Sequence, residues 1–299
     1  MLVRVLGSAA GGGFPQWNCG CPCCRAVREG SRPCLPRTQS SIAISADHEQ
    51  WFLVNASPDV RAQLEASPAL LPAAGRATPL QGVLLTDAEL DHALGLLLLR
   101  EAESLELHAT AAVHETLRTD NSLLATLQAY CPVKWREVVP GEDVALGNGL
   151  SYRAFDVFTT KRSRFGPDRG PGRVVGYRFT DERSGRAAVC LPGVQEITGQ
   201  VREQLRDCTG LFIDGTCFSD DEMPRLGLAS KTSREMGHLP MSGPGGSLEQ
   251  LAELPIERKI YVHLNNTNPV LLDDSPERRE VERLGFEIAT DGTEVQIRP

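Results

Sequence analysis

The chain has 299 residues, of which 41% are hydrophobic and 23% charged, which is typical of a soluble globular protein. Its formal net charge of −8, without a basic run, argues against binding to nucleic acid or to an anionic membrane. The longest strongly apolar stretch, Ala93–Leu99, is far shorter than the roughly 20 residues of a membrane-spanning helix. The first residues lack a basic segment followed by an apolar core, so we expect no secretory signal and a cytoplasmic location.

Short apolar runs bounded by turn residues predict strands along the whole chain. These runs are Leu2–Leu6, Ser41–Ser45, Trp51–Asn55, Val83–Thr86, Leu105–Ala109, Tyr152–Phe158, Val174–Phe179, Ala187–Leu191, Leu211–Asp214 and Lys259–His263. Near the C-terminus, Glu287–Thr290 and Thr293–Ile297 flank the pair Asp291-Gly292. An Asp-Gly pair between two such runs predicts a hairpin.

Helices are expected between these strands. They cover Asp59–Ala66, Asp91–Glu101, Ser122–Tyr130, Val194–Arg206 and Ser247–Leu254. Two stretches, Arg162–Arg173 and Ser219–Gly246, predict long loops, and long loops inside a compact domain are often functional. The alternation of strands and helices, without an internal repeat, predicts one layered α/β domain over residues 1–299.

Four of the nine cysteines lie within the six residues Cys19–Cys24, where Gly20 and Pro22 suit a tight turn. Thiolates bind zinc tetrahedrally, and closely spaced thiolates can fold around one ion. The spacing therefore favours an N-terminal zinc site with Cys19, Cys21 and Cys24 as ligands, Cys23 as a spare thiol, and a fourth ligand from elsewhere. A set of reduced thiols without metal is the alternative.

The segment Thr86–Gly95, directly after an apolar run, resembles the metal-binding loop of the metallo-β-lactamase superfamily. That loop has the usual pattern His-x-His-x-Asp-His. Here Asp87 and Glu89 stand where the first two histidines would be, while Asp91 and His92 remain. The resemblance implies that the scaffold is kept and that part of the usual two-metal site is lost.

Other positions of the superfamily's metal site point the same way. Near Thr159–Lys161 there is no third histidine, and Gly193 takes the place of the bridging aspartate. His263 ends its strand where the superfamily's last histidine stands. Asp91, His92 and His263 then make one carboxylate and two imidazoles, the ligand set of non-haem Fe(II) oxygenases, although zinc can also bind such a set.

Two simpler roles remain open for residues of this region. Asp91 can cap the helix that begins there while His92 is merely buried. Asp214, at the end of its strand, is expected either to accept a hydrogen bond from a ligand imidazole or to bond backbone amides.

Longer motifs carry a closer resemblance. The segments Gly7–Cys19, Arg37–Ser41, Asn55–Asp59, Arg234–His238 and His263–Pro269 resemble the pyrroloquinoline quinone (PQQ) biosynthesis protein B family, and the likeness runs from residue 1 to about 298. It implies a metallo-β-lactamase-like αββα sandwich, with the metal site in loops at the sheet edge. Related phosphodiesterases hold a structural zinc with three cysteines and a distant histidine, which implies that His238 joins Cys19, Cys21 and Cys24. A loop histidine bonded to backbone groups is the alternative for His238.

The resemblance also implies a function: Fe(II)- and oxygen-dependent hydroxylation of the tyrosine ring in a cross-linked Glu–Tyr intermediate of PQQ synthesis. The substrate would be a small amino-acid-like precursor, and other PQQ biosynthesis proteins are possible partners. Arg37, Lys231 and Arg234 are predicted anchors for substrate carboxylates, with solvent-exposed charges as the alternative. Two other functions stay open, namely a zinc-dependent hydrolase and a carrier that binds finished quinone for export without turnover.

Overall fold

The computed structural model describes residues 1–298, and within them the strands form two seven-stranded sheets. The first sheet, from edge to edge, consists of β14 (Glu294–Gln296), β1 (Leu2–Gly7), β2 (Ser41–Ser45), β3 (Trp51–Val54), β4 (Leu80–Leu84), β5 (Leu105–Ala109) and β6 (Val133–Glu137). The second consists of β13 (Phe286–Ile288), β12 (Arg258–Val262), β11 (Gly210–Asp214), β10 (Ala187–Leu191), β9 (Val175–Asp181), β8 (Leu150–Asp156) and β7 (Asp143–Gly147).

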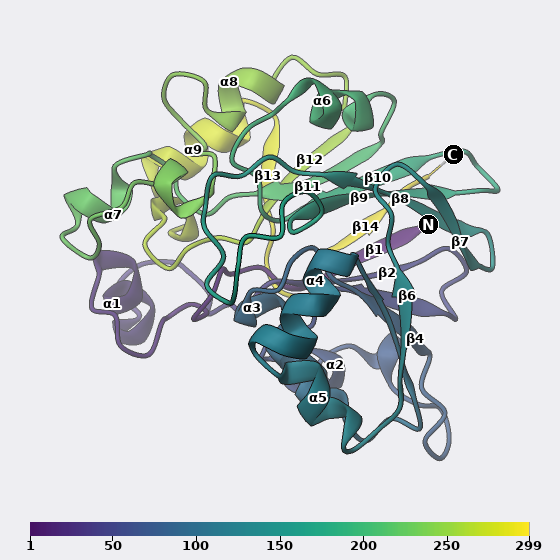
Figure 1. Ribbon diagram of the computed structural model, residues 1–299. Helices are drawn as coiled ribbons and strands as arrows, with labels where there is room; N and C mark the ends of the chain where they lie inside the picture. The colour runs from purple at the N-terminus through teal and green to yellow at the C-terminus, as the bar shows by residue number, and fades with distance from the viewer. Residues whose placement is uncertain (299) are drawn as a thin grey trace.

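The two sheets pack face to face around a shared apolar core. Val5 and Ile44 of the first sheet belong to the same buried cluster as Tyr177 and Phe212 of the second. Strand side chains alternate between two faces, so each sheet has a second apolar face that helices cover. These helices are α2 (Val60–Glu65), α4 (Ala111–Glu115) and α5 (Leu123–Gln128) on the first sheet, and α6 (Gly199–Leu205), α8 (Ser247–Leu251) and α9 (Pro276–Arg283) on the second (Figure 1). The predicted αββα sandwich is confirmed.

The predicted C-terminal hairpin is wrong. Strand β13 pairs in parallel with β12, whereas β14 pairs antiparallel with β1 in the other sheet. The turn at Asp291-Gly292 therefore carries the chain from one sheet to the other. The Asp291 carboxylate holds this corner because it accepts hydrogen bonds from the backbone and hydroxyl groups of both Ser8 and Thr38. The local turn signal was correct, but it carries no information about which sheet each strand joins.

The predicted helices over Asp59–Ala66, Ser122–Tyr130 and Ser247–Leu254 are present as α2, α5 and α8. The helix expected over Asp91–Glu101 is only α3 (Leu90–Ala93), followed by 3-10 turns over Leu94–Leu99. Here Gly95 lies against another backbone segment, and a Cβ on it would be 2.1 Å from the Ser57 carbonyl oxygen. In the stretch Val194–Arg206, only the part from Gly199 onward is helical.

Prediction from sequence missed the edge strands β6 and β7 and the helices α1 (Pro22–Glu29), α4, α7 (Glu222–Arg225) and α9. The long loop over Arg162–Arg173 is present between β8 and β9, whereas Ser219–Gly246 contains α7 and a 3-10 turn at Arg234–Met236. Within residues 1–298, every helix is too short or too polar to cross a membrane.

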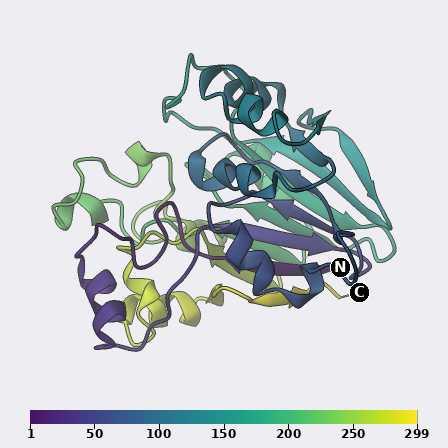
Figure 2. The ribbon, with the colours of Figure 1, turned by 90° about the horizontal axis from the view of Figure 1, so that it is seen from below.

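The loops at one end of the sandwich come from both sheets. Strands β4 and β5 run parallel, as do β10, β11 and β12, so their carboxyl ends lie along one edge of each sheet. Loops after β4, β8, β10, β11 and β12 meet there. The chain ends lie beside each other away from this edge, as the two views in Figures 1 and 2 agree. The candidate site is therefore built from loops at the carboxyl ends of the strands.

Candidate metal centre

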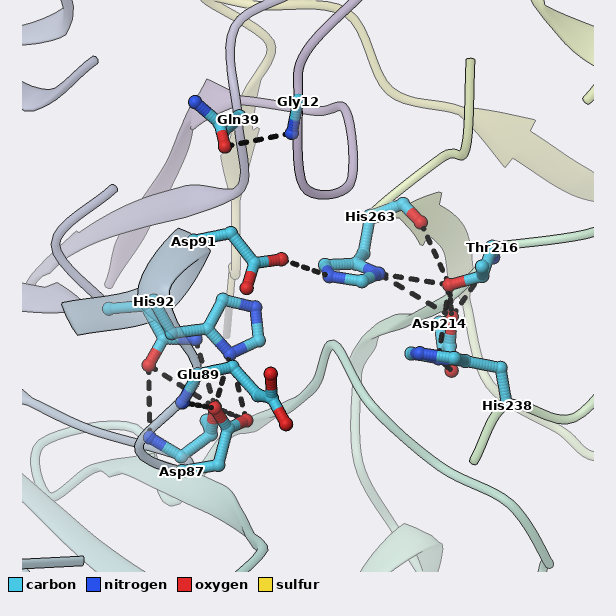
Figure 3. Close-up of polar contacts among 12 residues, drawn as sticks. Gly12, Gln39, Asp87, Glu89, Asp91, His92, Asp214, Thr216, His238 and His263 are labelled. Carbon is cyan, nitrogen blue, oxygen red and sulfur yellow. Dashed lines mark hydrogen bonds and ion pairs between the residues drawn. The ribbon is translucent and has the colours of Figure 1, made fainter. Parts of the chain in front are cut away.

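Three residues from two loops bring metal-binding atoms together. One ligand atom from each of Asp91, His92 and His263 lies within 4.8 Å of the others. Asp91 and His92 lie in α3 after β4, and His263 directly follows β12 (Figure 3). The His263 backbone is left-handed, with φ of 57°, a conformation that is uncommon outside glycine and often marks functional positions.

Asp87 orients the imidazole of His92. Its two carboxylate oxygens lie 2.9 and 2.8 Å from His92 Nδ1, and it also accepts a hydrogen bond from the Glu89 backbone. The other ring nitrogen, His92 Nε2, is buried and has no hydrogen-bond partner among residues 1–298. A ligand histidine commonly gives one nitrogen to a carboxylate and the other to the metal. Asp87, which stands where the superfamily has a ligand, therefore orients His92 instead.

The electrostatics around His92 favour a cation. Burial lowers the pKa of His92, but the carboxylates of Asp87 and Asp91 outweigh it and raise this pKa to about 9. Burial raises the pKa of Asp91, but the charges of His92 and His263 bring it well below its ordinary value. The carboxylates of Asp87 and Asp91 therefore favour positive charge at the position of the His92 ring.

Thr216 and Asp214 support His263. The Thr216 hydroxyl lies 2.9 Å from His263 Nδ1 and donates to Asp214 Oδ1 at 2.6 Å. Asp214 is fully buried, accepts hydrogen bonds from the Val194 and Thr216 amides, and lies 3.8 Å from His263 Nδ1. Both roles that the sequence left open for Asp214 are thus compatible with its position. The remaining nitrogen, His263 Nε2, lies 3.3 Å from Asp91 Oδ2.

His238 lies at this site and not with the cysteines, so its expected place beside Cys19, Cys21 and Cys24 needs correction. Its Nδ1 is 2.6 Å from Asp214 Oδ2, and its ring stacks on His263 with centroids 5.3 Å apart. The reason is the buried Asp214 carboxylate. Burial raises its pKa, but the charges of His238 and His263 bring the pKa below its ordinary value, so this carboxylate pairs with the imidazole.

The three cysteines do come together as the sequence indicates. Ligand atoms of Cys19, Cys21 and Cys24 lie within 4.8 Å of one another at the start of α1. A hydrogen bond from Cys23 lowers the pKa of Cys21 to about 5, which favours the thiolate that binds metals. The Cys23 sulfur also lies 3.6 Å from the Thr267 carbonyl oxygen and 3.7 Å from that of Asn268, and it is not one of the three sulfurs that gather within 4.8 Å.

Asn266 occupies the fourth side of the cysteine trio, and sequence reasoning missed it. Its amide nitrogen lies 3.3 Å from Cys24 Sγ and 3.7 Å from Cys21 Sγ. A half turn of the amide would present its oxygen to the sulfurs, because the two ends of an amide have nearly the same shape. The signal was within the motif His263–Pro269, where Asn266 lies three residues after His263. One loop thus reaches both candidate metal sites.

Two of the three predicted carboxylate anchors line neither of the two hollows at the site. Arg37 is only 4% exposed, and its guanidinium donates to the Ala289 carbonyl and the Ser8 hydroxyl. Arg234 donates to the carbonyls of Pro244 and Gly245 and so ties its loop together. Both guanidinium groups thus donate to backbone carbonyl oxygens. Lys231 does line a hollow beside His238 and His263.

A cavity opens over the three metal-binding side chains. Its apolar wall includes Val113, Val157, Phe158, Phe165 and Val194. The polar wall includes His92, His238 and His263 together with basic side chains of the loop between β8 and β9. An apolar wall facing charged groups suits a ligand with an aromatic ring and anionic substituents.

The buried Glu222 makes the stability of this region depend on pH. Glu222 accepts hydrogen bonds from the Thr267 hydroxyl and the Phe218 amide, which joins α7 to the loop after His263. Burial raises the pKa of Glu222 to about 7, above its ordinary value of 4.5. Between these two pH values the folded chain binds more protons than the unfolded chain, so stability falls as pH rises from 4.5 to 7.

We expect Glu222→Gln to remove this pH dependence, since glutamine keeps the shape and stays neutral. A tenfold difference in proton affinity between the folded and unfolded chains corresponds to about 1.4 kcal/mol. The wild type should therefore lose on the order of 3 kcal/mol more than the variant between pH 4.5 and 7. Urea unfolding of both proteins across that range measures the difference. If the free energies of unfolding of the two proteins changed in parallel with pH, the pKa of Glu222 would not be raised in the folded chain.

Known proteins share this fold and these motifs. The profile of the family described as Beta-lactamase superfamily domain matches residues 50–264. The coenzyme PQQ synthesis protein B of Azoarcus sp. (strain BH72) is 48% identical, over 98% of each chain. The protein of the same name from Cupriavidus necator is 46% identical, over 99% of each chain.

Solved structures agree with the sequence relatives. The zinc-bound crystal structure of PqqB from Methylobacterium extorquens superimposes with a TM-score of 0.91 at 38% identity, over 99% of this chain and 100% of that one. A diphosphatase of the PhnP family has a TM-score of 0.70 at 20% identity, over 98% of this chain and 96% of that one, and shares the fold.

Proposed function

Because the chain belongs to the coenzyme PQQ synthesis protein B family of the β-lactamase superfamily, we propose that it acts in PQQ synthesis as an Fe(II)-dependent hydroxylase. Its substrate is the tyrosine ring of a cross-linked Glu–Tyr intermediate, and dioxygen is the oxidant. One observation carries the proposal above the others. Among residues 1–298, His92 Nε2 is buried without a hydrogen-bond partner and lies beside Asp91 and His263, as expected of a nitrogen that binds a metal.

The residues present fit iron better than a two-metal centre. Asp91, His92 and His263 supply a carboxylate and two imidazoles, and both histidines have their Nδ1 engaged by other groups. When bound, Fe(II) would supply a change of oxidation state and open coordination positions for dioxygen and a phenol. Asp87 and Glu89 replace the two histidines of the usual loop. The Asp87 carboxylate contacts His92, and the Glu89 carboxylate pairs with Lys161.

His238 is the residue best placed to hold a proton near the substrate. Asp214 accepts from its Nδ1, so Nε2 is the nitrogen available to the cavity that His238 lines. An imidazole whose Nδ1 is held by a carboxylate can act as a general base through its other nitrogen. We propose that His238 accepts the proton of the substrate's phenol group. The apolar wall, which includes Phe158 and Phe165, holds the ring and limits access of water.

We also propose a structural zinc at the cysteine trio. Cys19, Cys21 and Cys24 provide three thiolates, and Asn266 is the nearest candidate for the fourth ligand. The expected role of His238 there passes to Asn266, because His238 is engaged by Asp214. Zinc at this position would fix the loop from which His263 projects.

The decisive experiment compares metals. Protein loaded anaerobically with Fe(II) is expected to hydroxylate the cross-linked Glu–Tyr diamino acid, with one oxygen atom from isotopically heavy dioxygen in the product, as measured by mass spectrometry. Zinc cannot change oxidation state and should be inert, and it should compete with iron because it binds such sites more tightly.

The zinc-bound state of the Methylobacterium extorquens relative favours one rival, a zinc-dependent hydrolase. Equal turnover by zinc-loaded protein without iron and oxygen would establish that rival. A carrier of the finished quinone would bind PQQ but consume no oxygen with either metal. Oxygen uptake therefore identifies the hydroxylase, and turnover without oxygen separates the hydrolase from the carrier.

A further inference from the structure

Basic side chains gather on the loop between β8 and β9, at the cavity over the metal-binding residues. Lys161, Arg162, Arg164 and Arg173 all line this cavity. In a chain of net charge −8, these four cations outnumber the three carboxylates that line the same cavity, which are those of Asp87, Glu89 and Asp91. Such a group raises the local concentration of anions.

A single carboxylate, that of Glu89, holds two of these cations. Its Oε1 lies 2.9 Å from Lys161 Nζ, and its Oε2 lies 3.0 Å from Arg164 Nε. Glu89 belongs to the loop that also carries Asp87, Asp91 and His92 (Figure 3). Glu89, Lys161 and Arg164 line both the cavity and a second hollow, and Asp91 and His263 also line both. The ion pairs therefore lie beside the candidate metal site.

We propose that Lys161 and Arg164 receive a carboxylate of the substrate and that Glu89 takes its place when the substrate is absent. This inference rests on the proposed function, which supplies a substrate with amino-acid carboxylates. The groups are suited to exchange because they are partly exposed, with 26% of the Glu89 side chain and 68% of Arg164 accessible. Ion pairs in contact with water are weak, so a substrate carboxylate can replace Glu89 at little cost.

The loop does not need Glu89 to hold its position. At its base, the Thr160 amide donates to Gln195 Oε1 at 2.7 Å, and Arg173 donates to the Thr159 carbonyl at 3.1 Å. The stem of Lys161 lies against Gly237, where an added Cβ would be 3.1 Å from Lys161 Cβ. Gly237 directly precedes His238, so this packing keeps Lys161 beside the site. The contacts of Glu89 with the two cations are therefore available for exchange.

Binding measured without turnover tests the inference. Fe(II)-loaded full-length protein is titrated anaerobically, by calorimetry, with the cross-linked Glu–Tyr diamino acid and with its fully methyl-esterified form. We expect the wild type to bind the acid about tenfold more tightly than the ester. The double variant Lys161→Met, Arg164→Met should lose that preference and leave ester binding unchanged. Glu89→Gln should tighten acid binding, because it removes the competing carboxylate.

The matched control is the exposed pair of Arg118 and Glu115, whose guanidinium and carboxylate lie 2.8 Å apart away from the candidate metal site. Arg118→Met and Glu115→Gln should leave both affinities unchanged. Equal binding of acid and ester by the wild type, or weaker acid binding by Glu89→Gln, would overturn the inference. If binding depends on charge but no hydroxylated product forms, the proposed function fails while the carboxylate site stands. If hydroxylated product forms but the acid and the ester bind equally well, the proposed function stands and the carboxylate site fails.

Discussion

Replacing His263 with alanine is expected to abolish oxygen-dependent hydroxylation of the cross-linked Glu–Tyr substrate. His263 supplies one of the three proposed ligands, and its Nε2 lies 3.3 Å from Asp91 Oδ2. Loss of one of three ligands should greatly weaken iron binding, because only one carboxylate and one imidazole would remain to hold the ion. His92→Ala should have the same effect. Product formation and iron content after reconstitution measure the outcome.

The control for these variants is His114→Ala, because His114 stacks on Trp135 away from the candidate metal site. It should keep both iron and activity. Zinc content at the cysteine trio should be unchanged in all three variants, since none of these histidines lies among Cys19, Cys21 and Cys24. An active His263→Ala protein with full iron occupancy would refute the assignment of the ligand set.

Replacing Cys21 with serine is expected to lower zinc content and thermal stability together. Cys21 is the thiol with the lowered pKa, and it both begins α1 and joins Cys19 and Cys24. Structural zinc contributes on the order of 10 kcal/mol to folding in small peptides, so its loss should lower the melting temperature clearly. Metal analysis of the purified protein and a thermal unfolding curve give the two measurements.

Two variants sharpen this test. Cys34→Ser changes a partly exposed thiol outside the trio and should preserve both zinc and melting temperature. Asn266→Ala should lower zinc affinity less than Cys21→Ser, because a neutral amide is a weaker zinc ligand than a thiolate. If Cys21→Ser keeps its zinc and its melting temperature, the cysteine trio is not a metal site.

Much of the core was predictable because its signals are local. Each central strand, such as Ala187–Leu191, is a short apolar run, and such runs are buried between covered faces whatever the order of the strands. Asp91 and His92 were identified because they are adjacent in a loop of known pattern. His263 was identified because it ends a strand. In these cases the sequence position itself limits where the side chain can lie.

Other features depend on contacts between distant segments, which no local pattern describes. His238 joins Asp214 because a buried carboxylate needs a partner, and only the folded chain shows which imidazole is near. Arg37 looked like a substrate anchor, but its guanidinium bonds the carbonyl of Ala289, which is 252 residues away. Asn266 is adjacent to the cysteines only because β12 returns the chain to the N-terminal segment.

The pairing of β1 with β14 has a consequence for biosynthesis. Leu2 lies opposite Gln296, so β1 acquires its outer neighbour only after all the strands between β1 and β14 have been synthesised. Contacts of such long sequence separation form slowly, because the chain must close a large loop before it gains any contact energy. Asp91 and His263 also belong to separate halves of the nascent chain. A metal held by both residues could therefore bind only after His263 has been synthesised, and a stalled or truncated chain would expose unpaired strand edges before that point.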